Sequence, residues 1–97
     1  MAFKIIWSPK AVETFDKVID YLDKNWTEKE IKKFVRETEH VIHLVSINPH
    51  LFRASEKENI FEAIITKHNL LLYQVNQQAK TIGLLSFFDT HQDPKKK

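Results

Sequence analysis

Cysteine is absent from this chain of 97 residues, and glycine occurs only once. Without cysteine there is no disulfide framework and no thiolate chemistry. A single glycine excludes the glycine-rich loops that bind nucleotide phosphates. No apolar run approaches the roughly 20 residues that a membrane-spanning helix needs, and the N-terminus lacks the apolar segment of a signal peptide. We therefore expect a cytoplasmic protein without a membrane partner.

Arginine is also scarce: the chain has two arginines, Arg36 and Arg53, and thirteen lysines. The planar guanidinium is the side chain best suited to hold a phosphate in a fixed geometry. An enzyme that acts on phosphates would therefore have few guanidinium groups available if it had only these two arginines. The net charge of +2 is compatible with an acidic partner or nucleic acid but requires neither.

The content of 42% hydrophobic and 29% charged residues is typical of a folded domain. A chain of this length forms one core, so we expect a single domain over residues 1–97. Ser8 and Pro9 predict a helix start, with serine as the N-cap and proline at the first helical position. Thr27 and Glu30 have the spacing of a capping box, which predicts the start of a second helix. Hydrophobic periodicity then predicts helices over 9–26 and 28–47, and strands over 3–7, 60–66, 70–76 and 81–88.

The predicted order is β-α-α-β-β-β, an α+β fold. Three successive strands with short turns should form an antiparallel meander, and two helices joined by a short turn should form a hairpin. Such a hairpin can cover only one face of the sheet. Because the last two strands are apolar on both faces, we expect the second face to be partly covered as well, with a partner chain as one possible cover.

Several short segments, in this order, resemble the RelE/ParE toxin superfamily, the plasmid-stabilisation toxins of type II toxin–antitoxin systems. They are Trp7-Ser8-Pro9-Lys10-Ala11, Ile19-Asp20-Tyr21-Leu22, Ile47-Asn48-Pro49 with Phe52-Arg53, Tyr73-Gln74-Val75 and Phe88-Asp89-Thr90-His91-Gln92-Asp93-Pro94. The resemblance covers essentially the whole chain. It implies a compact sheet with a helical hairpin on one side, and a cognate antitoxin whose C-terminal segment wraps the toxin.

The resemblance also implies one of two targets. RelE-like members cut mRNA on the ribosome with a cluster of lysines and arginines and a tyrosine or histidine near the C-terminus. ParE-like members are taken to poison DNA gyrase and lack that set. Here Leu70-Leu71-Leu72 stands where the family has a strand arginine, and Asp89-Thr90-His91-Gln92 replaces arginines after the last strand. The chain is therefore expected to be a growth-inhibiting toxin closer to the ParE-like branch. The alternatives are a RelE-type endoribonuclease and an inactive homologue that retains only antitoxin binding.

If the chain does cleave RNA, His91 is the leading candidate for the acid or base, since histidine titrates near neutral pH. Arg53 and Lys57, together with the terminal lysines 95–97, could supply positive charge if the loop folds towards the tail. The competing interpretation is a solvated histidine bonded to Asp89 or Asp93.

Three other features have simpler explanations. Tyr73 could present its hydroxyl on the open face of the sheet, but a strand tyrosine is more often half-buried packing. His40 and His43 could share a metal, yet no third or fourth ligand stands near them, so no metal and no cofactor is expected. Gly83, inside the last strand, predicts a bulge or a close approach of another backbone.

Overall fold

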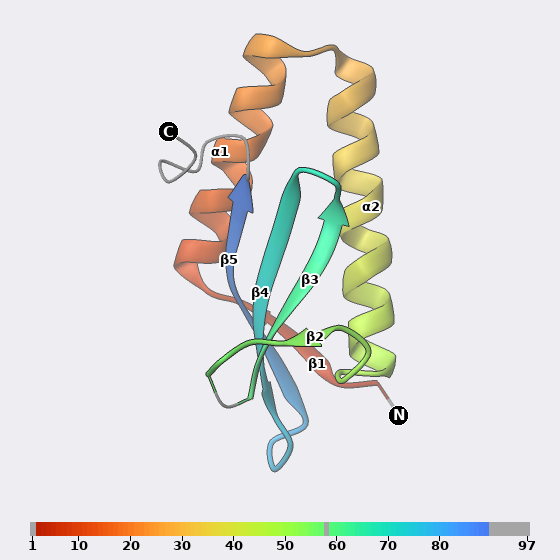
Figure 1. The fold of residues 1–97 in the computed structure, drawn as a ribbon, viewed down its shortest axis with the longest axis vertical. Helices are drawn as coiled ribbons and strands as arrows, with labels where there is room; N and C mark the ends of the chain where they lie inside the picture. Colours follow the sequence, from red (N-terminus) through yellow and green to blue (C-terminus); the bar gives the residue numbers. More distant parts are fainter. Residues whose placement is uncertain (1, 58, 90–97) are drawn as a thin grey trace.

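A five-stranded sheet carries two long helices on one of its faces (Figure 1). The computed structural model describes residues 2–57 and 59–89. The elements, in chain order, are β1 (Lys4–Trp7), α1 (Pro9–Asn25), α2 (Glu28–Ile47), β2 (Arg53–Ala54), β3 (Ile60–Thr66), β4 (Asn69–Asn76) and β5 (Thr81–Asp89). The α+β class and the order β-α-α-β-β-β are confirmed, with the short β2 as an addition.

The strands lie side by side in the order β1-β5-β4-β3-β2. The meander of β3, β4 and β5 is antiparallel, as predicted, and β1 pairs with β5 in parallel. The chain between β1 and β5 contains both helices and the other three strands. Helix α1 packs against β5, and α2 packs against β3. Two features were not predicted: the pairing of β1 with β5, and the short strand β2, which pairs with the start of β3. Both depend on contacts far apart in the sequence.

The two helices begin in different ways. The Ser8 hydroxyl accepts the N–H of Ala11 at 3.0 Å and donates to the carbonyl of Leu85 at 3.2 Å, so the cap also ties α1 to β5. Thr27 is the N-cap of α2, but its side chain makes no capping hydrogen bond. The predicted start of this helix is therefore correct, but the side-chain hydrogen bond that a capping box implies is not formed. The backbone carbonyl of Thr27 accepts the N–H of Glu30 instead, at 3.0 Å.

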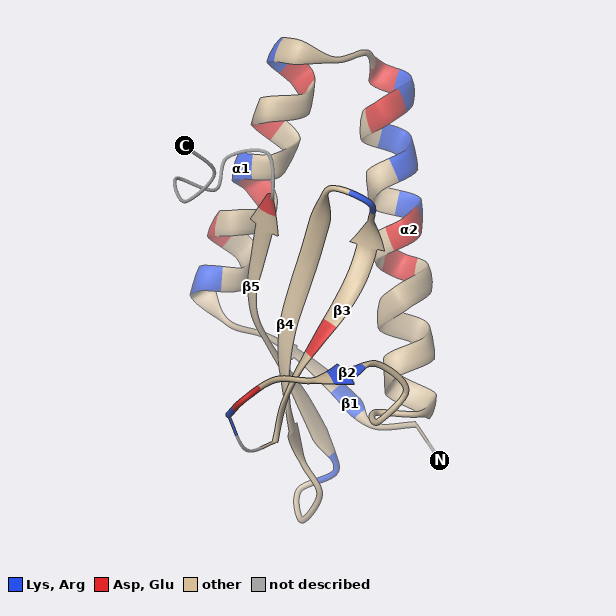
Figure 2. Cartoon of the chain, viewed as in Figure 1, with Lys and Arg blue, Asp and Glu red and all other residues tan. Residues whose placement is uncertain are grey.

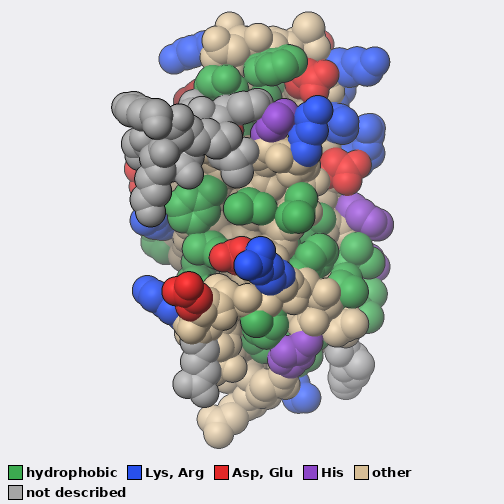
Figure 3. Space-filling model, viewed as in Figure 1, with side chains coloured by type: hydrophobic (Ala, Val, Ile, Leu, Met, Phe, Trp, Pro, Cys, Tyr) green, Lys and Arg blue, Asp and Glu red, His purple; other side chains and the backbone are tan. Residues whose placement is uncertain are grey.

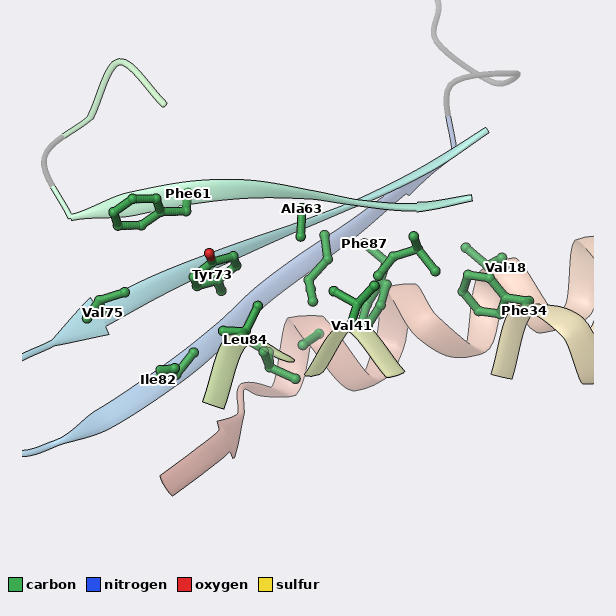
Figure 4. Close-up of a cluster of buried hydrophobic side chains, with 14 residues drawn as sticks. Val18, Phe34, Val41, Phe61, Ala63, Tyr73, Val75, Ile82, Leu84 and Phe87 are labelled. Carbon is green, nitrogen blue, oxygen red and sulfur yellow. The ribbon is translucent and has the colours of Figure 1, made fainter. Parts of the chain in front are cut away.

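The core lies between the helices and the sheet (Figure 4). Phe15, Phe34 and Phe87 form an aromatic cluster with Trp7, and the centroids of Phe15 and Phe87 are 5.3 Å apart. Edge-to-face pairs of this kind stabilise a core beyond the area that they bury. Apolar residues at helical spacing supply most of the contacts of the helices with the core, but Val12 and Trp26, which belong to the predicted pattern, are 46% and 50% exposed. Trp26 is the C-cap of α1, and its extended backbone takes it out of the helical repeat.

Candidate functional site

The face of the sheet opposite the helices is the candidate site, and we call it the open face. Side chains alternate between the two faces of a strand, so Tyr73 and Leu71 point to the core while Leu70 and Leu72 lie on the open face. Figure 3 looks onto this face, where apolar side chains gather over the middle of the sheet.

An apolar row crosses three strands of the open face. Ile64 on β3, Leu70 on β4 and Phe88 on β5 are register partners. Ile64 is 61% exposed and Phe88 is 45% exposed. Leu72 lies two residues from Leu70 on the same face, and we call these four residues the apolar patch. Contiguous apolar surface of this kind on a soluble protein marks a site of interaction.

Few charges accompany the apolar patch. Arg53 on β2 and Glu62 on β3 are register partners, so a basic residue and an acidic one lie next to each other beside the patch. Most other charged residues lie on the helices and loops, and the strands β3 to β5 are almost free of them (Figure 2). The middle of the open face therefore has little net charge.

The structure describes two of the three predicted catalytic residues, Arg53 and Lys57. Arg53 lies three strands from β5. The strand spacings place it on the order of 15–20 Å from Asp89, where β5 ends. Lys57 is exposed in the loop before β3, where its N–H donates to the Ser55 hydroxyl at 3.1 Å. His91 lies outside the described residues, so this catalytic set stays a prediction.

Tyr73 is fully buried and faces the helices, which confirms the packing interpretation. Its hydroxyl donates to the carbonyl of Pro49 at 2.8 Å. Burial raises the pKa of Tyr73 from 10.0 to about 12, and a backbone hydrogen bond from Phe52 opposes that rise. A neutral, enclosed phenol cannot act on a substrate at the open face.

A pocket of about 580 Å³ lies between the far end of the helical hairpin and the turn from β3 to β4. Trp26 and Phe34 contribute aromatic surface, and Glu30 and Lys33 contribute opposite charges. Asn69 also lines this pocket, and its Nδ2 donates to the Thr66 hydroxyl at 2.9 Å. The Oδ1 of Asn69 is buried without a hydrogen-bond partner among the described residues. Sequence patterns did not point to this pocket, because its walls come from five separate elements, α1, α2, β3, β4 and β5.

A second hollow, of about 520 Å³, lies on the open face at the end of the sheet nearer the turn between β4 and β5. We call it the amide groove, because five of its nine lining residues are asparagine or glutamine. The residues are Ile6, Asn59, Gln74, Val75, Asn76, Gln77, Gln78, Thr81 and Gly83. None of these side chains is ionisable.

Two properties of the described residues, 2–57 and 59–89, bear on the possible chemistry. They contain no group of three or more histidine, cysteine, aspartate or glutamate side chains placed to hold a metal ion. Their helices include none that is long and apolar enough to span a membrane.

Comparison with known proteins identifies the family. Residues 5–94 match the family described as the ParE toxin of the type II toxin–antitoxin system parDE. No curated protein matches the sequence.

Solved structures of similar fold include several toxins. The chromosomal ParDE system from P. aeruginosa matches with a TM-score of 0.73 and 16% identity, over 91% of this chain and 96% of that one. The RelBE2 toxin–antitoxin complex from Mycobacterium tuberculosis matches with a TM-score of 0.65 and 15% identity, over 92% of both chains. The YoeB dimer from Staphylococcus aureus matches with a TM-score of 0.61 and 20% identity, over 89% of this chain and 94% of that one. At these identities the likeness is one of fold.

Proposed function

Because the chain belongs to the family of ParE toxins of type II toxin–antitoxin systems, we propose that it inhibits growth in the ParE-like manner, with DNA gyrase as its target. A cognate antitoxin neutralises it by covering the open face.

The apolar patch is the observation that carries this proposal. Leu70 and Leu72 lie on the open face of the central strand β4, and Leu70 has Ile64 and Phe88 as its register partners. Apolar side chains gain free energy when a protein surface covers them, by about 25 cal/mol for each Å² removed from water. The face is thus suited to a protein partner, and a partner helix or strand could lie across it.

The charge distribution argues against phosphate handling on the same face. Cleavage of RNA requires cations near the scissile phosphate, where negative charge develops. Arg53 is the one arginine on the open face among the described residues, and its register partner is the acidic Glu62. The carboxylate of Glu62 on the neighbouring strand lowers the positive potential around Arg53, which weakens its attraction for a phosphate.

The proposal is tested by inducing the chain in bacterial cells, alone and together with the product of the neighbouring open reading frame. We expect growth arrest when the chain is alone and growth when both are present. Purified DNA gyrase should then lose supercoiling activity in the presence of the chain, while ribosome-bound transcripts stay intact.

Other results would point to the alternatives. Defined cuts in ribosome-bound transcripts, with gyrase unaffected, would identify a RelE-type endoribonuclease. Full expression without growth arrest, combined with tight binding of the neighbouring gene product, would identify an inactive homologue.

A further inference from the structure

The single glycine of the chain has no structural reason to be a glycine. Gly83 lies inside β5, where it is the register partner of Gln74 on β4 and of Ile6 on β1. Its φ is not positive, so its backbone conformation is open to other residues. A Cβ built on Gly83 would meet no atom within 4 Å.

The predicted bulge does not account for this glycine either. The register shifts between Leu72 and Tyr73, whose partners are Ser86 and Leu84, so the extra residue is Leu85. Gly83 itself is in regular pairing. Glycine weakens the interior of a strand, and where no bulge or bend requires it, it marks a place where another backbone or a ligand approaches closely.

The missing side chain leaves the floor of the amide groove open. Ile6 and Gln74 flank Gly83 on the two neighbouring strands, and all three line the groove. The side-chain carboxamides of Asn59, Gln74 and Gln78 make no hydrogen bond to any other residue that the structure describes. A carboxamide offers both a donor and an acceptor, which is also what a peptide main chain offers.

We propose that the amide groove receives an extended, uncharged segment of the antitoxin, whose main chain crosses β5 directly over Gly83. This inference rests on the proposed function, because it specifies which part of the antitoxin binds in the amide groove. The carboxamides of Gln74, Gln78 and Asn59 hydrogen-bond the N–H and C=O groups of that segment. The apolar side chains of the same antitoxin segment contact the apolar patch, which lies farther along β4 and β5 on the open face.

The charge of the lining favours a peptide over a nucleic acid. Binding of single-stranded RNA relies on a positively charged groove along its backbone, and none of the nine residues that line the amide groove is charged. Lys4, the register partner of Thr81, is one cation on the neighbouring strand. One lysine neutralises one phosphate, which is little for a nucleic-acid site.

The test is the affinity of the purified full chain for the product of the neighbouring open reading frame, measured by calorimetry. Gly83→Val fills the groove and should fold with an equal or higher melting temperature, since valine favours strands. We expect its affinity to fall by about tenfold or more, because a main chain can no longer reach the sheet. The matched control is Ala54→Val, which adds similar bulk to β2 outside the groove and should change the affinity by less than about twofold.

A folded Gly83→Val variant with unchanged affinity would overturn the inference. If Gly83→Val does not fold, Gln74→Ala provides the same test, since it removes a groove carboxamide and keeps the backbone pairing of β4. Binding of an oligoadenylate that Gly83→Val abolishes, with antitoxin affinity unchanged, would assign the groove to RNA and would also overturn it.

Growth assays separate this inference from the proposed function. Gly83→Val alone should still arrest growth, but co-expression of the antitoxin should no longer rescue the cells. If the wild-type chain fails to arrest growth, the proposed function fails, while the difference in affinity still decides what occupies the groove. If Gly83→Val loses growth arrest but keeps antitoxin affinity, the groove serves the target and the inference is wrong.

Discussion

The hydroxyl of Tyr73 donates a hydrogen bond of 2.8 Å to the carbonyl oxygen of Pro49. Tyr73 lies in the middle of β4, and Pro49 follows the end of α2. The bond thus fixes the start of the connection between α2 and β2 against the central strand of the sheet. Both residues are buried, so neither group can exchange this partner for water.

Replacing Tyr73 with phenylalanine should lower the free energy of unfolding by about 1–3 kcal/mol, because the buried carbonyl of Pro49 loses its partner. Urea denaturation followed by circular dichroism measures the change. Tyr21→Phe on α1, where the side chain is only partly buried, is the control and should cost less than about 0.5 kcal/mol. An equal loss in both variants would show that the Tyr73 bond contributes nothing specific.

Tyr73 should also make the stability depend on alkaline pH. Its pKa is 10.0 in the unfolded chain and about 12 in the folded protein. Between these values the folded state holds the phenolic proton more tightly than the unfolded state, so stability is present below pH 10 and is lost as the pH rises towards 12. We expect this group to account for a loss of about 2 kcal/mol over that window. The difference between wild-type and Tyr73→Phe denaturation curves isolates it, and parallel curves would contradict the prediction.

The two helix caps form a matched pair for mutation. Ser8→Ala removes the bond to the Ala11 N–H and the bond to the Leu85 carbonyl, and should cost about 1–2 kcal/mol. Thr27→Ala removes a side chain that makes no capping bond, and should cost less than about 0.5 kcal/mol. Thermal melts compare the two variants. A larger loss at Thr27 than at Ser8 would contradict the assignment.

Changes in the apolar patch should affect partner binding without unfolding the chain. Ile64 is 61% exposed, so Ile64→Lys should leave the melting temperature within a few degrees of wild type. The same change places a charge in the interface, and we expect the affinity for the antitoxin to fall by about tenfold or more. Val12→Lys is the matched control, since Val12 is also exposed but lies on α1. Equal affinities for the two variants would place the antitoxin elsewhere.

The nuclease alternative has its own test in three alanine variants. Under a ParE-like mode, Arg53→Ala, Lys57→Ala and His91→Ala should each arrest growth as the wild-type chain does. Cells that express each variant from a titratable promoter provide the comparison. A loss of growth arrest of about a hundredfold in viable counts, with unchanged protein levels, would instead indicate the acid–base catalysis expected of His91.

Most of the elements followed from local chemistry. Ser8 and Pro9 marked the start of α1, and the apolar repeats of the two helices identified most of the residues that face the sheet, with Val12 and Trp26 as exposed exceptions. The three strands of the meander were predicted within one residue of their observed bounds. These features depend on neighbours in the sequence, and so periodicity and capping could reveal them. The Thr27 capping box failed because the spacing of a motif does not guarantee its hydrogen bond.

The site was only partly predictable. The apolar open face and its expected partner followed from two strands that are apolar on both sides. The amide groove did not, because Asn59, Gln74 and Gly83 are separated in sequence and meet only through the pairing of β4 with β5 and through the loop before β3.

The sequence by itself determined which segments are helices and strands, and that one face of the sheet would remain apolar, because both depend on the period of its side chains. The tertiary structure decided that β1 joins β5 in parallel, that Tyr73 bonds to Pro49, and that Gly83 opens a groove. Each of these joins segments that are far apart in the sequence, and the packing of the whole core sets their relative positions.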